Sequence, residues 1–457
     1  MADSPSSLSK AYASWGRFPE ARPAGVERLA WRTRLPDLDA FAQPVLAYGQ
    51  GRSYGDSCLN NGGVLLDTDG LDRLIAFDQT TGRVRAEAGV TLAKLLDVLV
   101  PAGWFLPVTP GTKFVSLGGA IANDVHGKNH HVAGTFGRFV TAMELVRSDA
   151  AGGDHRLVLT PDGRPLGGGD PDDAVADLFR ATIGGLGLTG LITWAEFQAI
   201  PIQSDQIAVT STRFRSLPEF LTLADAAADE PYTVAWIDAL SPQGRGLFMQ
   251  GHHVAGSLPA PSRFRQKLAA PFDAPSGTLN ALTVRAFNAV YYRAQLRDVV
   301  RSRKHYEPFF YPLDAVGDWN RIYGRRGFLQ YQCVVPFSDG VSVTEALLAE
   351  ISAAGAASFL AVLKTFGDVP SPGLLSFPRP GITLALDLPH RGPETLALVR
   401  RLNAIAIEAG GALYPAKDAV MTPAQFRASF PDWEAFAAHV DPQFSSSFWR
   451  RVTTAER

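Results

Sequence analysis

The pattern of apolar and polar positions divides the chain into a glycine-rich first part and a strand-rich second part. In the first part, short apolar runs at 45–48, 63–68 and 74–88 are bounded by turn residues, which predicts strands. Apolar residues recur at helical spacing over 91–100 and stop at Pro101, which predicts a short helix. We therefore expect residues up to about 195 to combine short strands, helices and glycine loops.

From about residue 200 the glycine loops stop and longer strand-like runs take over. The strand candidates are 206–214, 232–240, 246–254, 327–337, 357–367 and 381–390. Helical spacing is found at 343–354 and again at 394–411, where Gly410 and Gly411 are typical of a helix end. This half of the chain is expected to build a sheet with helices beside it.

Composition and charge limit the classes of function. The chain has 457 residues, 46% hydrophobic and 19% charged, with a formal net charge of −2. This length predicts more than one domain, and the near-neutral charge argues against a nucleic acid partner. Cys58 and Cys333 are too far apart for a metal or redox motif, which favours a reducing compartment.

The sequence also bears on membranes. Residues 1–17 contain no apolar segment typical of a secretory signal, and no run of about 18 uncharged apolar residues occurs. We therefore expect a cytoplasmic protein, with peripheral attachment to the inner membrane left open.

The first candidate for chemistry is the glycine loop at 47–57, with Gly49, Gly51 and Gly55. A Rossmann fingerprint needs glycines at relative positions 1, 3 and 6 followed by a helix, whereas here they fall at 1, 3 and 7 before a predicted strand. No Gly-Lys-Ser/Thr sequence closes a Walker loop. Taken alone, the loop fits either a phosphate cradle or a surface hairpin without a ligand.

Two further glycine clusters favour the phosphate cradle. Residues 110–131 read PGTKFVSLGGAIANDVHGKNHH, and Gly118-Gly119 stand where a helix begins, so free N–H groups are expected to face an anion. Residues 182–193 read TIGGLGLTGLIT before a strand. Three such loops in one domain can together hold an extended diphosphate.

These motifs, with Arg52-Ser53-Tyr54-Gly55-Asp56 and LYPAKD at 413–418, resemble the flavoproteins of the vanillyl-alcohol oxidase and p-cresol methylhydroxylase (PCMH) type. Within that family the chain resembles the oxidases that act on decaprenylphosphoryl ribose, and the resemblance covers nearly the whole chain. It implies an α+β fold: a PCMH-type FAD-binding domain of two α/β subdomains at 1–195, and a cap domain for the substrate at 196–409. The cap domain would hold an antiparallel sheet flanked by helices, and 410–457 would return to the FAD-binding domain.

The resemblance implies non-covalent FAD, because some covalent members attach FAD through a histidine where this chain has Tyr54. By position, it assigns to the cofactor Ala47, Tyr48, Gly49, Gln50, Gly51, Arg52, Ser53, Tyr54, Gly55, Asp56, Ser57, Gly111, Ser116, Leu117, Gly118, Gly119, Asn123, Asp124, Val125, His126, Leu191, Ile192 and Tyr414.

Oxidation of a secondary alcohol requires hydride transfer to flavin and removal of the hydroxyl proton. Lys417 is the first candidate for the second role, because a desolvated lysine can accept a proton; it could instead stay charged and orient the oxygen. Spacing alone favours a salt bridge between Lys417 and Asp418, whereas the resemblance favours catalysis. His126 is the second candidate for the base.

Substrate contacts are expected on the predicted sheet. Gln330 and Gln332 alternate on one strand, so both face the same side, and Lys364 lies on another strand. Amides and a cation suit a sugar ring or its phosphate, although a solvent-exposed face explains them equally well. Tyr54 and Trp236 are candidate pocket walls.

Three positions depart from the family pattern. Relatives carry asparagine at Thr383, cysteine at Ala385 and tyrosine at Phe310. We still assign Thr383 and Ala385 to the substrate pocket, but the changes put the exact sugar and lipid length in doubt. Since alanine has no thiol, nitroaromatic inhibitors that capture the cysteine are not expected to react covalently here.

Residues 293–305 form a basic segment. Arg293, Arg297 and Arg301 would lie on one face of a helix, with Leu296, Val299 and Val300 opposite. A solvated face is the ordinary explanation, but a basic amphipathic segment also suits an anionic membrane surface. A polyprenyl-phosphoryl sugar would need such a contact.

Together, the resemblance implies FAD-dependent oxidation of the 2′-hydroxyl of a polyprenyl-phosphoryl-β-D-ribose to the 2′-keto sugar. A separate NAD(P)H-dependent short-chain reductase would complete epimerisation to the arabinose donor of a cell-envelope glycan. The alternatives are an FAD-dependent aldose, alditol or aldonolactone oxidase and a flavin-free binding protein. Lys128, Asn129, His130 and His131 could suggest a metal, but no carboxylate completes a ligand set, so none is expected.

Overall fold

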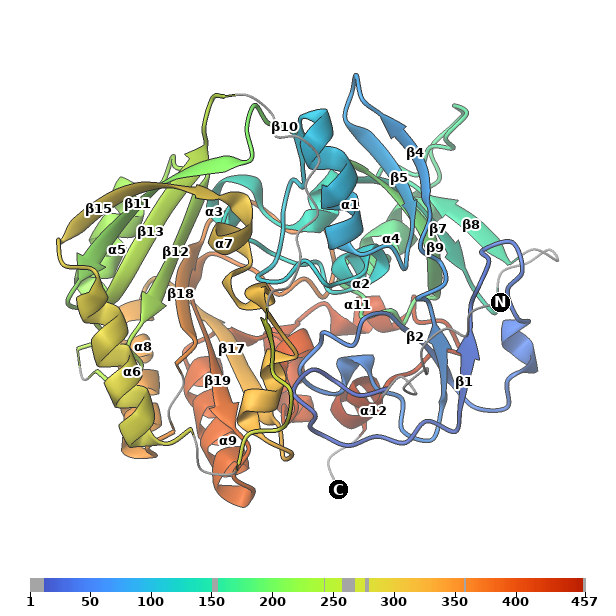
Figure 1. Cartoon of the computed structure of the whole chain (residues 1–457). Coiled ribbons are helices and arrows are strands. Elements are labelled where there is room, and N and C mark those ends of the chain that lie inside the picture. The colour runs from blue at the N-terminus through green and yellow to red at the C-terminus, as the bar shows by residue number, and fades with distance from the viewer. Residues whose placement is uncertain are drawn as a thin grey trace, which may run out of the picture.

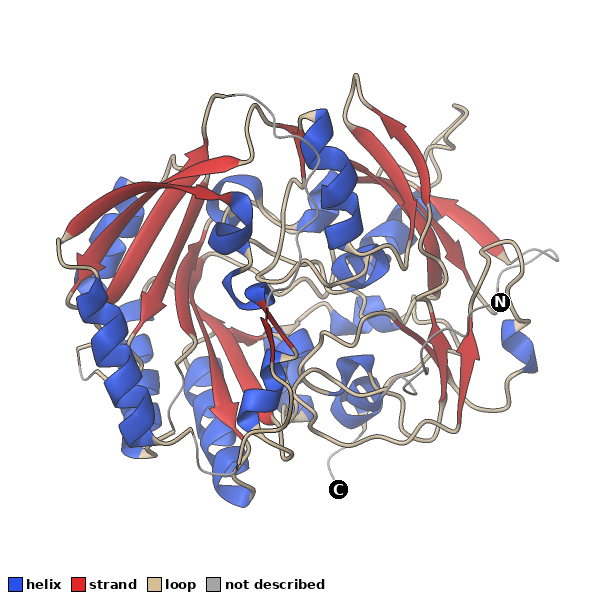
Figure 2. Cartoon of the chain, viewed as in Figure 1, coloured by secondary structure: helices blue, strands red, loops and turns tan. Residues whose placement is uncertain are grey.

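The computed structural model describes residues 12–149, 155–241, 243–256, 268–275, 279–356 and 359–454. Residues 1–11, within the stretch expected to hold no secretory signal, lie outside the described residues. Figure 1 shows a large sheet on the left and two smaller sheets on the right, and Figure 2 shows loops and short helices between them. The fold is α+β, as predicted.

The first part of the chain forms two of these sheets. A parallel sheet contains β1 (Gly25–Arg28), β3 (Val64–Asp67) and β2 (Val45–Tyr48) in that order. An antiparallel sheet has the order β4-β5-β9-β7-β8, with β4 at Leu74–Asp78, β5 at Arg83–Glu87, β9 at Leu191–Gln198, β7 at Val140–Val146 and β8 at Arg156–Leu159. Because β2 and β3 are parallel, the first glycine loop crosses between them and is not a hairpin.

The predicted helices of this part are confirmed. Helix α1 (Leu92–Leu99) is capped by the Thr91 side chain, and its Leu92, Leu95, Leu96 and Leu99 are buried. Helices α2 (Leu117–Ala122) and α4 (Asp173–Thr182) follow, and α2 lies between the sheets in Figure 1.

The second part forms an eight-stranded antiparallel sheet of order β15-β11-β13-β12-β18-β19-β17-β20. Its strands are β11 (Gln206–Phe214), β12 (Tyr232–Ile237), β13 (Gly246–His253), β15 (Val299–His305), β17 (Phe328–Val335), β18 (Ala361–Phe366), β19 (Gly381–Pro389) and β20 (Ala412–Leu413). The six predicted strands of this region are therefore confirmed.

The two faces of this sheet have different partners, because successive side chains of a strand point to opposite sides. On β19, Leu384, Leu386 and Leu388 pack into a core with helices α5 (Leu217–Ala226), α8 (Gly340–Ala353) and α9 (Pro393–Glu408). The opposite face carries the polar residues of β17, β18 and β19. That face turns toward the first part of the chain.

The last segment contacts both parts. Strand β20 is an edge of the large sheet, whereas Phe444 forms a bridge with Val45 of β2. Helices α10 (Pro423–Ser429), α11 (Trp433–Ala437) and α12 (Ser447–Thr453) complete the chain.

The helical interpretation of 293–305 is wrong. Helix α6 (Ala281–Ala294) includes Arg293 and ends one residue later. Residues 299–305 form β15, an edge strand paired with β11. Val299 and Val300 have high strand propensity, and pairing with β11 satisfies their backbone groups, so tertiary pairing overrides the spacing of the arginines. Arg293 and Arg301 therefore lie on different elements.

Candidate active site

The first glycine loop presents backbone donors. Between β2 and the short helix η2 (Asp56–Cys58), the N–H groups of residues 50–53 find no hydrogen-bond acceptor among the described residues. Gly51 has a φ of +60°, and a Cβ there would lie 2.2 Å from the Tyr48 hydroxyl, so only glycine fits. Four adjacent free N–H groups are what a diphosphate needs.

The expectation of free N–H groups at the start of α2 is wrong. The Leu117 N–H donates to the Val90 carbonyl, and the Gly118 N–H donates to the Ala88 carbonyl, both at 2.8 Å. The Gly119 N–H meets the Ser116 hydroxyl at 3.3 Å. The first N–H groups of α2 therefore donate to carbonyls of the preceding β5–α1 connection. Helix α2 can offer a ligand its surface, but not these N–H donors.

One cavity of about 340 Å³ connects the three glycine loops with the polar face of the large sheet. Most of the predicted cofactor residues line it: Ala47, Gly49, Gln50, Gly51, Arg52, Ser53, Tyr54, Ser57, Gly111, Ser116, Gly118, Gly119, Asn123, Val125, His126, Ile192 and Tyr414. Residues of the second and third clusters thus line the same cavity as residues of the first.

Six predicted cofactor residues do not line this cavity: Tyr48, Gly55, Asp56, Leu117, Asp124 and Leu191. The Tyr48 hydroxyl donates to the Ala13 carbonyl, and Leu117 and Leu191 are core residues. Asp124 accepts from the Gly137 N–H and the Ser376 hydroxyl. Asp56 faces Arg451 and Gly55 faces Asp418, both away from the cavity. These residues support the cavity wall from behind.

The remaining features of the cavity fit a flavin dinucleotide. The free N–H groups of 50–53 suit its diphosphate. Deeper in the molecule, buried polar atoms at Ser57 Oγ, Asn123 Oδ1 and His126 Nδ1 have no hydrogen-bond partner in the part of the chain that the structure describes. Buried polar atoms are normally hydrogen-bonded, so three of them around one cavity indicate a polar ligand.

His126 is neutral and poorly suited to act as a base. Its Nε2 lies 3.0 Å from the Gln332 amide nitrogen, which can only donate, so Nε2 accepts and Nδ1 carries the proton. Burial first, and then the charges of Lys364, His130 and Lys417, lower the pKa of His126 well below its ordinary value. His126 therefore lines the cavity as a neutral imidazole.

Lys417 has the properties that a proton acceptor needs. It ends the short helix η7 (Pro415–Lys417), and its Nζ lies 3.8 Å from the ring centroid of Tyr54. Burial lowers the pKa of Lys417 to about 7, against the opposing charge of Asp387. The expected alternative, a salt bridge to Asp418, is wrong: no carboxylate pairs with Lys417 among the described residues.

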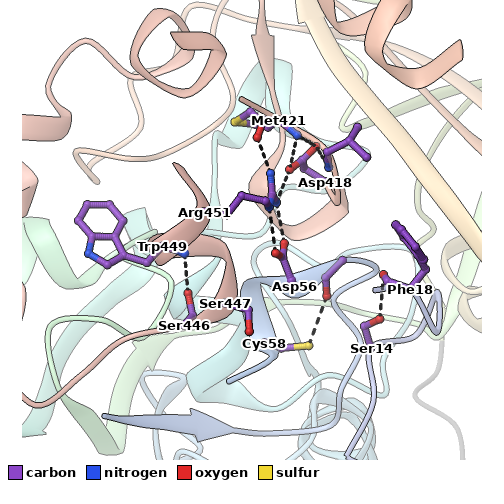
Figure 3. Close-up of polar contacts among 12 residues, drawn as sticks. Ser14, Phe18, Asp56, Cys58, Asp418, Met421, Ser446, Ser447, Trp449 and Arg451 are labelled. Atoms are coloured by element: carbon purple, nitrogen blue, oxygen red, sulfur yellow. Dashed lines mark hydrogen bonds and ion pairs between the residues drawn. The ribbon is translucent and has the colours of Figure 1, made fainter. Parts of the chain in front are cut away.

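Asp418 is instead bound by Arg451 of α12 (Figure 3). The Arg451 guanidinium pairs with Asp56 Oδ1 at 2.7 Å and with Asp418 Oδ2 at 2.8 Å. On the other side of this junction, the Tyr54 N–H donates to the Ala416 carbonyl at 2.8 Å. Arg451 therefore joins the loop that carries Tyr54 to the segment that carries Lys417, which sequence reasoning missed.

We expect Arg451→Met to lower the free energy of unfolding by about 2–3 kcal/mol, because it leaves two buried carboxylates without their cation. Denaturant unfolding of the FAD-loaded protein measures this. The matched control is Arg401→Met, which breaks an exposed pair with Glu350 and should cost less than about 1 kcal/mol. Equal effects of the two substitutions would contradict this role.

A second group that sequence reasoning missed is Asp387. This fully buried carboxyl of β19 accepts from the Gln330 amide at 2.5 Å and from the Tyr323 hydroxyl at 3.1 Å. Burial raises the pKa of Asp387 to about 7, and Lys417 opposes the shift. The signal for Asp387 in the sequence was an acidic residue within the apolar run that forms β19. Asp387 thus has two roles: it accepts a hydrogen bond from Gln330, and its charge acts on Lys417.

The predicted substrate residues fall into two groups, those that line the cavity and those that do not. Tyr54, Gln330, Gln332, Lys364, Ala385 and Lys417 line the cavity, so the exposed-face interpretation of the glutamines is wrong. Trp236 and Thr383 do not line it. Trp236 packs on Tyr291 of α6, and its indole donates to the Phe359 carbonyl. Thr383 lies behind Gln332, whose amide it accepts at 3.3 Å. Phe310 lines the cavity.

Among the described residues, no three histidine, cysteine or acidic groups lie close enough to hold a metal ion. Asn129 donates to the Pro107 carbonyl, and His131 contacts the Glu230 carbonyl. These members of the HGKNHH motif are thus structural, whereas Lys128 reaches the cavity.

Comparison with known proteins agrees with this geometry. Residues 35–152 match the family model of the FAD binding domain. The chain is 37% identical to decaprenylphosphoryl-β-D-ribose oxidase of Mycolicibacterium smegmatis over 430 residues, 89% of each chain. It is 33% identical to an uncharacterised protein of Streptomyces coelicolor over 384 residues, 79% of this chain and 100% of that one. It is 27% identical to L-gulono-1,4-lactone dehydrogenase of Mycobacterium tuberculosis over 222 residues, 47% of each chain.

Proposed function

Because this chain belongs to the family of FAD-binding oxidoreductases that contains decaprenylphosphoryl-β-D-ribose oxidase, we propose that it oxidises the 2′-hydroxyl of a polyprenyl-phosphoryl-β-D-ribose to a ketone. The enzyme is an FAD-dependent oxidoreductase. The observation that carries the proposal is Lys417, an amine without an ion-pair partner among the described residues, in a cavity that also holds two glutamine amides and two further lysines.

In the proposed reaction, the chain binds the sugar and moves one proton. Bound FAD supplies the hydride acceptor, held non-covalently by the loop at 50–53 and the surface of α2. The uncharged Lys417 amine takes the hydroxyl proton as the hydride leaves carbon 2. The Tyr54 ring below Nζ stabilises the ammonium that forms, because a cation over an aromatic face is attracted to it.

The neighbouring side chains fix the geometry of this step. Gln332 is held between His126 and Thr383, and Gln330 is held by Asp387, so both amides are pre-oriented before a sugar binds. Amide oxygens accept and amide nitrogens donate, which suits vicinal hydroxyls. Preorganised groups of this kind lower the cost of positioning the reacting carbon.

We expect the second-order rate constant of flavin reduction at limiting substrate, which reports the free enzyme, to rise as pH increases through about 7, the pKa to which burial lowers Lys417, because only the uncharged amine accepts a proton. Rapid-mixing measurements across this range test it. In Asp387→Asn the rise should move to lower pH, because the carboxylate no longer stabilises the ammonium. Lys364 titrates near the same pH, so Lys364→Met must retain the rise; its loss there would contradict the assignment.

The lipid part of such a substrate would need a surface beside a membrane, and we propose α6 and β15 for it. Leu282, Val290 and Leu296 are 77%, 70% and 88% exposed. Residues 281–305 carry six lysines and arginines and one acid, Asp298. Phe287 of α6 packs on Phe359, the neighbour of the cavity residue Leu360, so this surface adjoins the cavity.

Among the described residues, no helix has the length and apolar character needed to cross a bilayer. Contact would therefore be peripheral, combining apolar insertion with attraction to anionic lipid.

Charge reversal tests this contact. Arg293→Glu with Arg297→Glu should weaken binding to vesicles containing anionic phospholipid by at least about 10-fold, since each basic residue near such a surface contributes about 1 kcal/mol. Vesicle co-sedimentation measures it. Arg164→Glu with Arg180→Glu, two exposed arginines of the first domain, should leave binding unchanged. Equal losses of vesicle binding in the two double variants would refute a specific membrane-binding face.

Oxidation to the 2′-ketone is the first of the two half-reactions of an epimerisation. We propose that a separate NAD(P)H-dependent short-chain reductase returns hydride to the opposite face and gives the arabinose donor for cell-envelope glycan.

Product analysis tests the proposed activity. Turnover of a prenyl-phosphoryl ribose, followed by borodeuteride reduction, should place deuterium at carbon 2 and yield both the ribose and arabinose epimers. Oxidation of free aldoses, alditols or aldonolactones, with no turnover of the prenyl-phosphoryl sugar, would instead establish the alternative oxidase function. A purified protein without flavin would contradict both.

A further inference from the structure

Three lysines line the same cavity without a counter-ion. Lys128, Lys364 and Lys417 come from different segments, and none of them forms an ion pair with a described residue. Buried Lys113, by contrast, is paired with Glu307. Unpaired cations inside a protein are costly, so a group of three indicates a ligand that supplies negative charge.

Lys128 and Lys364 are neighbours, because the charge of Lys128 lowers the pKa of Lys364. The Lys364 ammonium donates to the Gly127 carbonyl at 3.3 Å, one residue before Lys128. The Lys128 ammonium donates to the Phe310 carbonyl, also at 3.3 Å. Each ammonium has three N–H donors, so each retains at least two for a ligand. A pair with four free donors matches the oxygen atoms of a phosphate group.

Among the described residues, no acid acts on the pKa of either lysine of the pair. Burial, followed by the charges of Lys128 and Lys417, lowers the pKa of Lys364 to about 7, whereas burial alone lowers the pKa of Lys128 to about 8. The histidines that face Lys364 are His126, His130 and His131, and Lys364 lowers the pKa of each. The one acid that acts on this group, Asp387, acts on Lys417.

We infer that Lys128 and Lys364 bind the phosphate of the substrate, an assignment that rests on the proposed function. In a prenyl-phosphoryl ribose, the phosphate is attached to carbon 1, next to the carbon that is oxidised. When the 2′-hydroxyl meets Lys417, the phosphate must therefore lie beside Lys417. The FAD diphosphate has its own donors in the loop at 50–53, so the lysine pair is available to a second anion.

Binding of a phosphate should charge the pair. At pH near 7.5, both lysines are partly deprotonated, and an anion between them raises the proton affinity of each. Ligand binding is then accompanied by proton uptake. A pair of lysines that served only to pack or to hold backbone carbonyls would show no such uptake.

The test uses the FAD-loaded enzyme and farnesyl phosphate as the probe. Calorimetric titration in two buffers of different ionisation enthalpy measures affinity and proton uptake together. Lys128→Met and Lys364→Met should each weaken binding about 10- to 100-fold and reduce the uptake. Lys94→Met, which removes an exposed lysine paired with Asp72, is the control and should bind as the parent does.

Steady-state kinetics with a prenyl-phosphoryl ribose separate the two proposals. KM should rise in both lysine variants, with a smaller effect on kcat. If the parent enzyme oxidises this sugar while both variants keep its KM and bind farnesyl phosphate normally, the phosphate site is wrong and the proposed function stands. If farnesyl phosphate binds with proton uptake but the sugar is not oxidised, the site stands and the proposed function is wrong.

Discussion

Lys417→Met is expected to slow reduction of bound FAD by substrate about 10²- to 10⁴-fold, the range over which a positioned general base contributes. Methionine keeps the length and apolar stem of lysine but cannot accept a proton. Anaerobic rapid mixing isolates this half-reaction from reoxidation. Because Lys417 contacts Tyr54 and not the loop at 50–53, FAD content should be unchanged.

The contrast with His126 decides between the two candidate bases. In His126→Gln, the amide can still meet Gln332, and we expect a loss of less than about 10-fold, because a neutral histidine with an engaged Nε2 does not take the proton. A reversed ranking, with the larger loss at His126, would assign the base to the histidine. Restoration of Lys417→Met activity by added primary amines would further support Lys417.

Gly55→Ala should produce the largest loss of stability among single-methyl additions. A Cβ at Gly55 would lie 1.6 Å from the Asp418 carbonyl oxygen, and both segments are fixed by Arg451, so neither can move apart freely. Overpacking against backbone costs about 2–3 kcal/mol, and the displaced loop should bind FAD more weakly. Denaturant unfolding and the flavin-to-protein absorbance ratio measure the two effects.

Gly167→Ala is the matched control. No atom lies within 4 Å of a Cβ at that position, and φ there is not in the left-handed region. The substitution should change the free energy of unfolding by less than about 0.5 kcal/mol and leave FAD content intact. If Gly55→Ala behaved like this control, the two segments would not be held together as described.

The sequence was informative where a local pattern matched a local structure. Period-two runs predicted β17 and β19, and the alternation of Gln330 with Gln332 correctly placed both amides on one face. Glycine spacing excluded a Rossmann turn, and the observed loop joins parallel strands without a following α-helix. Such features depend on neighbours within a few residues.

Features that depend on distant partners were not predictable. The N–H groups of α2 are taken by carbonyls of residues 88 and 90, and Asp418 is bound by Arg451, 33 residues away. Likewise, the arginine spacing at 293–301 suggested a helix, but pairing with β11 decides the structure. Asp387 carries no motif of its own, and its importance appears only when Gln330 and Lys417 lie beside it.

The central claim is that one cavity holds the flavin next to a ribose carbon, with the Lys417 amine at its hydroxyl. The most direct measurement is anaerobic addition of a prenyl-phosphoryl-β-D-ribose to the oxidised enzyme, followed at about 450 nm, where oxidised flavin absorbs. The account predicts stoichiometric bleaching with this sugar and none with its 2′-deoxy analogue. Unchanged absorbance with the ribose, or equal bleaching with the 2′-deoxy analogue, would contradict it.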